Sequence, residues 1–279
     1  MSRIKKQPIP LSGKLVLLGA GKMGGAMMEG WLAAGVVPSQ IVVFDPAPPK
    51  EIVTLIKNHG LKHNPEISSL SNVEVILAAV KPQILDEAVV PFLPLKSQKP
   101  LILSIAAGRT ISCFESHFGT DAAVIRTIPN TPAAVGRGIT AMAVNGNVSD
   151  GQVALAKALL QSIGDVVSVD SEDQIDAVTG LSGSGPAYVF YMTECLAKAG
   201  EAQGLSADVA MKLARATVEG SGELMRSSGT EAATLRENVT SPNGTTLAGL
   251  QVLMAENGLE DLMKRTVDAA TRRSRELAS

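Results

Sequence analysis

The strongest indication of the fold is the segment KLVLLGAGKMG, at residues 14–24. An apolar run over residues 14–18 leads directly into Gly19, Gly21 and Gly24, which match the pattern GxGxxG. In that pattern the first glycine permits a tight turn, the second lets the backbone approach a pyrophosphate, and the third lets a helix pack close to the strand. The amides at the start of that helix then face the anion. Because the glycines follow a predicted strand and open a predicted helix, this stretch indicates a dinucleotide-binding site.

Asp45 closes the next predicted strand, at about the spacing of roughly 20 residues that separates the glycines from the ribose-binding acid in this pattern. Its carboxylate can accept hydrogen bonds from ribose hydroxyls and would repel a 2′-phosphate. No arginine follows it, and Lys50 is the nearest base. These residues favour NADH over NADPH. The alternative is that Asp45 only caps the turn at Pro46.

Outward from this stretch, short apolar runs alternate with helical patterns as far as residue 170. The runs lie at residues 14–19, 41–45, 73–80, 101–107, 122–128, 140–144 and 166–169. Most are continuously apolar, as expected of strands that are covered on both faces. The helical patterns between them lie at residues 23–34, 50–58, 84–90 and 150–163. This alternation predicts right-handed crossovers and a mostly parallel sheet.

After residue 171 the sequence predicts helices and no strand. We therefore expect an α/β Rossmann-type domain with a mostly parallel sheet over residues 1–171, followed by an all-α domain over residues 172–279. Residues 188–197 carry a single charge, Glu194. A helix that is apolar on nearly every side needs partners all round, so we expect helices that are exchanged or packed across a homodimer.

Composition excludes several classes of protein. Lys and Arg number 25 against 27 Asp and Glu, and this balance argues against nucleic acid as the main partner. The 45% of hydrophobic residues exclude a disordered chain. No stretch is apolar for the roughly 18 residues of a membrane span. The basic residues within residues 1–13 precede no apolar segment of a signal peptide, so a cytoplasmic protein is expected.

Neither cysteine lies in a CxxC pair, and the three histidines, His59, His63 and His117, show no HExxH pattern or paired ligand spacing. We expect no metal site. Cys195 lies in an apolar run and is expected to be a small buried hydrophobic residue. Cys113 lies in a predicted short helix, with no evident base to activate it.

The segments that follow three predicted strands are polar or rich in glycine and proline. They cover residues 80–83, 104–108 and 126–132. Ligands of open α/β sheets bind outside the carboxyl ends of the strands, and rigid polar loops at that edge commonly carry function. We expect these three segments to contribute to the site.

Four motifs occur in order along the chain: VKPQ at residues 80–83, IPNTP at 128–132, DAVTGLSGSGPAY at 176–188 and NVTSPNGTT at 238–246. With them the chain resembles the pyrroline-5-carboxylate reductase family over residues 14–277. The resemblance implies reduction of the cyclic imine L-1-pyrroline-5-carboxylate to L-proline with NADPH or NADH. It also implies a helical domain that interlocks into dimers, and often a ring of five dimers.

The resemblance also implies roles for individual residues. Together with the motif analysis it predicts that the cofactor is bound by Gly19, Gly21, Lys22, Met23, Gly24, Asp45, Val80, Lys81, Pro82, Ala106, Ala107 and Asn130. It predicts that the substrate carboxylate and ring nitrogen are bound by Ser241, Gly244, Thr245 and Thr246. We expect Thr246 to contact the ring nitrogen and thus to be the catalytic residue. A helix is expected over residues 246–256, and its free amides would suit a carboxylate. The alternative is a plain junction of loop and helix that is capped by Thr245 or Thr246.

The chain departs from the family pattern at Asn243, where glycine is usual. Asn tolerates positive φ better than most residues, so the loop can keep its shape. Asp45 replaces the polar residue and arginine of some relatives, which favours tolerance of NADH. Two other functions remain open: a reductase of hydroxyacids or other imines on the same plan, and a dinucleotide sensor without catalysis. The helix after residue 186 has no lysine before Lys198, whereas hydroxyacid dehydrogenases of this plan place a basic lysine there.

Overall fold

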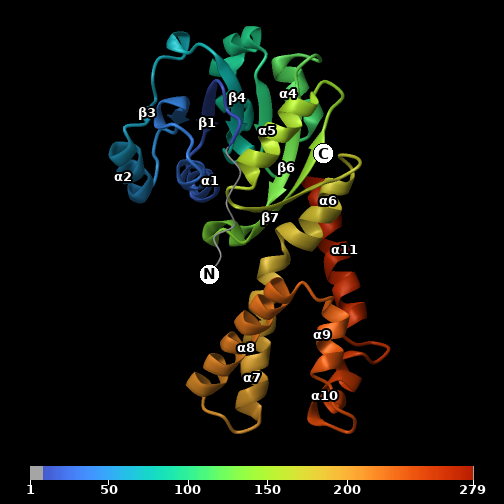
Figure 1. Ribbon diagram of the computed structural model, residues 1–279. Helices are drawn as coiled ribbons and strands as arrows, with labels where there is room; N and C mark the ends of the chain where they lie inside the picture. The colour runs from blue at the N-terminus through green and yellow to red at the C-terminus, as the bar shows by residue number, and fades with distance from the viewer. Residues whose placement is uncertain (1–8, 279) are drawn as a thin grey trace. The chain divides into compact units, whose positions relative to one another are not determined.

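The structure is a computed structural model that describes residues 9–278 (Figure 1). The chain forms two compact units. The first consists of the residues up to Gly183 together with those from Thr271 onward, and the second consists of Ser184–Ala270. The sequence-based domain limits at residues 171 and 172 rest on pattern rather than compactness, and they stay a prediction. The expectation that residues 1–13 hold no signal peptide concerns residues that lie largely outside the described part of the chain.

The first unit is built on one sheet of eight strands in the order β3-β2-β1-β4-β5-β6-β7-β8. The strands are β1 (Lys14–Leu18), β2 (Ile41–Phe44), β3 (Lys62–His63), β4 (Val73–Ala78), β5 (Leu101–Ser104), β6 (Val124–Pro129), β7 (Gly138–Val144) and β8 (Gly164–Ser168). Every neighbouring pair is parallel except β6 and β7, which run antiparallel. The predicted mostly parallel sheet is confirmed. The edge strand β3 was not predicted, because two exposed polar residues carry no apolar pattern.

Helices cover both faces of this sheet (Figure 1). They are α1 (Lys22–Ala33), α2 (Lys50–His59), α3 (Leu85–Val89), α4 (Ile111–Phe118), α5 (Asp150–Leu160) and α6 (Gln174–Val178). Residues of α1, α2 and α5 pack in one apolar cluster, and residues of α3 and α4 pack in another. The unit is therefore a three-layer α/β sandwich.

The continuous apolar runs follow from this sandwich. In β1, Leu15 and Leu17 pack in the cluster with α1, whereas Val16 and Leu18 pack in the cluster with α4. Successive strand side chains point to opposite faces, so a strand with helices on both sides must be apolar at every position. All four side chains are buried.

The end of the chain also packs in the first unit. Helix α11 (Leu259–Ala278) buries Thr271 and Ser274, and the Ser274 hydroxyl donates a hydrogen bond of 2.6 Å to Asp176 Oδ1. Near its last turn, the carbonyl of Leu277 lies 3.0 Å from the place that a Cβ would take on Gly108. The C-terminal helix therefore lies close against the loop after β5.

The second unit consists of helices. They are α7 (Gly185–Ala202), α8 (Ala207–Ser228), α9 (Ala232–Asn238), α10 (Thr245–Leu253) and the first part of α11. Helices α7 and α8 lie side by side (Figure 1). Among the described residues no strand follows β8, as the sequence predicted. No described helix is both long and apolar enough to cross a bilayer.

Apolar side chains of the second unit are largely exposed in the single chain. Its buried cluster consists of Ala197, Ala210 and Ala214, where α7 and α8 approach closely. Phe190 is 63% exposed. The expectation that Cys195 is buried is wrong for the single chain, in which Cys195 is exposed. Helix α7 meets α8 through Ala197, so only part of its apolar surface is covered.

Candidate active site

The three glycines of the first loop meet different surroundings. Gly19 has φ of +89°, and a Cβ there would lie 2.8 Å from the carbonyl oxygen of Ala79. A Cβ on Gly24 would lie 2.3 Å from the carbonyl oxygen of Gly19. A Cβ on Gly21 would meet no protein atom within 4 Å. Gly19 and Gly24 are therefore required by the protein's own packing, and Gly21 borders open space next to the start of α1.

Asp45 lies beside this loop. Its Oδ2 accepts a hydrogen bond of 2.7 Å from the Ala20 amide, and its Oδ1 accepts one of 2.8 Å from the Ala47 amide. Each carboxylate oxygen has two lone pairs, so each keeps one for a further donor such as a ribose hydroxyl. The turn-capping role and the ribose-binding role are thus compatible in one side chain.

The segments after three parallel strands lie at one edge of the sheet. The Ala79 amide donates to the Leu18 carbonyl, and the Ile105 amide donates to the Ala78 carbonyl, at 2.8 and 3.1 Å. Strand β1, between β2 and β4, is the point from which the strand order runs both ways. Open α/β sheets bind ligands at such a point. The predicted cofactor residues Val80, Lys81, Pro82, Ala106 and Ala107 all belong to the segments at this edge.

Arg109 joins two of these segments, and sequence reasoning missed it. Its Nε donates a hydrogen bond of 2.9 Å to the carbonyl of Pro82, and Nη2 donates to the same oxygen. Its Nη1 forms an ion pair of 2.9 Å with Asp86 Oδ2. The loop after β4 is thereby fastened to the loop after β5. The available signal was an arginine directly after Gly108 in a strand-end loop.

Asn130 follows β6, and its side chain is engaged by the protein. Its Nδ2 lies 3.3 Å from the hydroxyl of Ser182, and its Oδ1 accepts a hydrogen bond of 2.9 Å from the Ile139 amide. The side chain fixes the end of β6 to the start of β7 and to the segment before α7. A cofactor contact of Asn130 stays a prediction.

The predicted substrate residues lie in the turn between α9 and α10 and at the start of α10. Asn243 has φ of +58°, in the left-handed region that suits glycine and asparagine. The loop therefore adopts the conformation expected for a glycine at this position. The Gly244 amide donates to the Ser241 carbonyl at 3.1 Å, and a Cβ on Gly244 would lie 2.4 Å from the Ser241 hydroxyl oxygen. A side chain at Gly244 would therefore displace the Ser241 hydroxyl from its present position.

Helix α10 begins at Thr245, and Gly244 is its N-cap without a side-chain cap. The sequence placed the helix start at Thr246, one position late. The first amides of a helix have no partner within the helix. Ser241, Thr245 and Thr246 are exposed around these amides. Hydroxyls and amides together can bind a carboxylate.

The residues of the first unit fit a dinucleotide. Gly21 leaves open space where a pyrophosphate would approach the start of α1, no acidic residue lies in the first turn of α1, and Asp45 keeps acceptors for ribose hydroxyls. The parallel sheet with this loop defines a Rossmann-type dinucleotide-binding protein, of the class that contains the nicotinamide-dependent oxidoreductases.

Comparison with known proteins narrows this class. Residues 172–277 match the family model described as pyrroline-5-carboxylate reductase dimerisation, and residues 14–108 match the model described as NADP oxidoreductase coenzyme F420-dependent. The pyrroline-5-carboxylate reductase of Synechocystis sp. is 42% identical over 96% of this chain and 99% of the relative. That of Pseudomonas aeruginosa is 37% identical over 95% of this chain and 97% of the relative. The chain belongs to the pyrroline-5-carboxylate reductase family.

Solved structures agree with this assignment. A pyrroline-5-carboxylate reductase from Coxiella burnetii, 31% identical, has a TM-score of 0.89 and covers 96% of this chain and 100% of its own. The pyrroline carboxylate reductase of Plasmodium falciparum, solved with NADP bound, is 28% identical, has a TM-score of 0.78 and covers 96% of this chain and 99% of its own.

Proposed function

We propose that this chain reduces L-1-pyrroline-5-carboxylate to L-proline with NADPH or NADH, the final step of proline biosynthesis. The observation that carries the proposal is the turn over Ser241–Thr246. Asn243 adopts the left-handed conformation in this turn, and the turn leads into the free amides and the hydroxyls at the start of α10. The similarity of this chain to a pyrroline-5-carboxylate reductase extends over nearly its whole length.

The substrate roles follow from the chemistry of this turn. We propose that the free amides of Thr245 and Thr246 at the start of α10, with the hydroxyls of Ser241 and Thr245, bind the substrate carboxylate, while Gly244 shapes the turn. The dipole of α10 adds a favourable interaction with that anion. The Thr246 hydroxyl would form a hydrogen bond with the ring nitrogen and thereby orient the imine carbon.

Cofactor binding is proposed for the first unit. A nicotinamide dinucleotide supplies a hydride when it is bound. Gly21, Lys22 and Met23 would hold its phosphates at the start of α1, while Asp45 would hold the adenosine ribose. Gly19 and Gly24 shape that loop through their contacts with the protein. The segments that contain Val80–Pro82, Ala106–Ala107 and Asn130 would line the nicotinamide, and Arg109 keeps the first two of them together.

An imine suits this set of residues better than an alcohol does. Oxidation of a hydroxyacid needs a base, and α7 offers no lysine before Lys198. An imine nitrogen can arrive already protonated, so reduction requires mainly orientation of the substrate. This difference favours the pyrroline carboxylate over a hydroxyacid as substrate.

The activity is tested with purified full-length protein by following NADH and NADPH oxidation with the pyrroline carboxylate and, separately, with β-hydroxyacids. We expect turnover with the imine and none with the hydroxyacids. Binding of NAD(P)H without consumption after addition of the imine would contradict the enzyme and favour the sensor.

Thr246→Ala tests the catalytic hydroxyl. A hydrogen bond to a charged group is worth about 1.5–3 kcal/mol, so kcat/KM for the imine should fall about 10- to 100-fold. Thr246→Ser keeps the hydroxyl and should retain most of the activity. An unchanged kcat/KM in Thr246→Ala would exclude the proposed role.

NADH tolerance is proposed from Asp45. In parallel assays the unaltered protein should use NADH at a rate comparable to NADPH. Asp45→Ser removes the charge that would repel a 2′-phosphate and should shift the ratio of kcat/KM values toward NADPH. A large NADPH preference of the unaltered protein would contradict this role of Asp45.

For assembly, we propose an interlocked homodimer that can build a ring of five dimers. The exposed apolar side chains of α7 and α8, and the match of residues 172–277 to a dimerisation family, support the dimer. Light scattering coupled to size-exclusion chromatography would distinguish a dimer from a decamer. The expected cytoplasmic location remains a prediction.

A further inference from the structure

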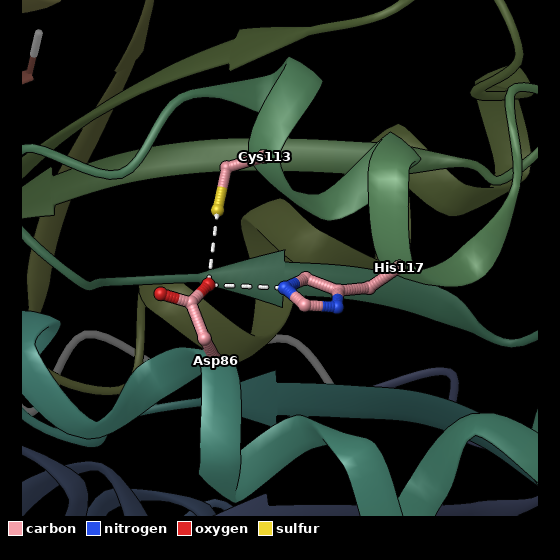
Figure 2. A group of neighbouring side chains, drawn as sticks. All are labelled: Asp86, Cys113 and His117. Carbon is pink, nitrogen blue, oxygen red and sulfur yellow. Dashed lines mark hydrogen bonds and ion pairs between the residues drawn. The ribbon is translucent and has the colours of Figure 1, made fainter.

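Helices α3 and α4 of the first unit bring together three side chains with different metal-binding atoms (Figure 2). Cys113 and His117 are four residues apart on α4, so they lie on the same face of that helix. Asp86 reaches them from α3. One ligand atom from each of the three side chains lies within 4.8 Å of the other two. No second group of this kind occurs elsewhere among the described residues.

One carboxylate oxygen faces both other groups. Asp86 Oδ1 lies 3.0 Å from His117 Nε2 and 3.8 Å from Cys113 Sγ (Figure 2). In a tetrahedral zinc site the metal–ligand distances are about 2.0–2.3 Å, so neighbouring ligand atoms are roughly 3.3–3.8 Å apart. The observed separations need only small side-chain movements to reach that geometry.

We propose that Asp86, Cys113 and His117 bind one Zn²⁺ through a carboxylate oxygen, a thiolate sulfur and an imidazole nitrogen. These are three ligand types that zinc takes in proteins. Asp86 is exposed and the other two side chains are half-buried, so the metal can enter from solvent and water can fill the fourth position. The three residues belong to the first unit, whereas the proposed substrate residues belong to the second, and the metal is assigned to no step of the imine reduction.

Arg109 holds the carboxylate from the other side. Its Nη1 binds Asp86 Oδ2 at 2.9 Å and leaves Oδ1 directed at the thiol and the imidazole. Partners of this kind orient metal ligands. The same nitrogen lies 3.8 Å from Cys113 Sγ, and its positive charge opposes that of zinc. The carboxylate and thiolate balance the charge of Zn²⁺. Because the arginine is close and only three side chains bind the metal, we expect weaker binding than in a structural site with four protein ligands.

The protonation of the ligands is coupled to binding. In the metal-free protein the hydrogen bond with His117 lowers the pKa of Asp86, and zinc would replace that hydrogen bond, because it would bind the same Nε2 and Oδ1 atoms. Burial raises the pKa of the Cys113 thiol. Formation of the zinc–sulfur bond therefore releases the thiol proton to solvent, as metal binding to cysteine generally does.

The proposal differs from the sequence-based expectation of no metal site. The spacing of Cys113 and His117 on one helix was a signal that could have been noticed. Asp86 could not be added to it, because only the packing of α3 against α4 brings this residue close.

Cobalt provides the direct test, because a thiolate bound to Co²⁺ absorbs in the near ultraviolet. Reduced, metal-free full-length protein is titrated with Co²⁺. We expect one Co²⁺ per chain, a thiolate-to-cobalt band, and loss of that band when Zn²⁺ is added. Cys113→Ser should abolish the band, and His117→Gln and Asp86→Asn should weaken binding about tenfold or more. The matched controls Cys195→Ser and His59→Gln should bind as the unaltered protein does.

Two outcomes would overturn the proposal: absence of a thiolate band in the unaltered protein, or a band that persists in Cys113→Ser. A second measurement guards against variants that fail to fold. Zn²⁺ should raise the melting temperature of the unaltered protein and of the two controls, but not that of Cys113→Ser or His117→Gln. Equal shifts in all of these proteins would likewise exclude the site.

Discussion

The two compact units bury apolar side chains to very different degrees. In the first, large residues such as Trp31 and Phe114 are completely buried between the sheet and its helices. In the second, the buried cluster consists of three alanines, whereas Phe190 and Tyr191 on α7 are 63% and 64% exposed. The first unit thus closes its own core, and the second leaves most of its apolar surface open in the single chain.

Because of this difference, we expect the second unit to depend on association with another chain. Burial of apolar surface stabilises a fold by about 25 cal/mol per Å², and the second unit gains little of this within one chain. Large contiguous apolar patches on a protein commonly mark an interface. The match of residues 172–277 to a dimerisation family agrees with a second copy of the chain as the cover.

The largest effect is expected from Phe190→Asp. A charge placed in an apolar interface is left without water or a partner, so the dimer should dissociate and activity should fall at least about 100-fold. Light scattering should show monomers that still bind NAD(P)H. Val37→Asp, at a position of the first unit that is 54% exposed, is the matched control and should remain dimeric and active. If Phe190→Asp remained dimeric and active, the second unit would not depend on association through this surface.

Trp31→Ala tests the self-contained core of the first unit. Trp31 is fully buried and its Nε1 donates a hydrogen bond of 3.0 Å to the Leu159 carbonyl. Removal of such a side chain costs about 3–5 kcal/mol of unfolding free energy. Unfolding by denaturant, monitored with a signal that reports on the first unit, should show the lower free energy of unfolding at every protein concentration. A loss that disappears at high concentration would mean that this core too depends on association.

The pair Gly24→Ala and Gly21→Ala separates packing from ligand binding within the first unit. A Cβ on Gly24 would collide with the Gly19 carbonyl. Gly24→Ala should therefore reduce the free energy of unfolding by about 1–3 kcal/mol and clearly lower the melting temperature. Gly21 has open space, so Gly21→Ala should melt like the unaltered protein. It should nevertheless bind NAD(P)H more weakly, measured by fluorescence titration. Unchanged affinity in Gly21→Ala would argue against a pyrophosphate at this position.

The smallest effect is expected at Asn243 in the second unit. A residue other than glycine or asparagine in the left-handed region costs about 1 kcal/mol. Asn243→Ala should therefore raise the KM for the imine several-fold, while Asn243→Gly should leave it close to that of the unaltered protein. Steady-state kinetics of the two variants decide this. Similar constants for both would show that the turn does not depend on the left-handed conformation.

Local signals were the ones that sequence reasoning used correctly. The run into Gly19 and the continuously apolar strands predicted the sheet, because a strand covered on both faces must be apolar throughout. The tolerance of Asn243 for positive φ was also predicted, and its φ of +58° confirms it. The start of α10 was misplaced by one residue because Gly244, rather than a threonine, caps it.

Contacts between segments distant in the chain could not be predicted. The link from Arg109 to the Pro82 carbonyl, and the approach of Asp86 to Cys113 and His117, join residues that lie on different elements. No periodicity or spacing announces such contacts. The exposure of Cys195 was misjudged for the same reason. The apolar pattern of a helix does not show which of its sides is covered by residues of the same chain.

Sequence patterns were sufficient to predict most strands and helices along the chain, the glycine loop with its acidic partner, and the turn before α10, since each depends on neighbouring residues and backbone preferences. Which side chains share a site depends on the tertiary structure. Packing of α3 against α4 creates the Asp86 cluster, and the sheet order places the three strand-end segments at one edge. Such proximity is fixed by how whole faces bury one another, and a linear pattern does not encode the partner of a face.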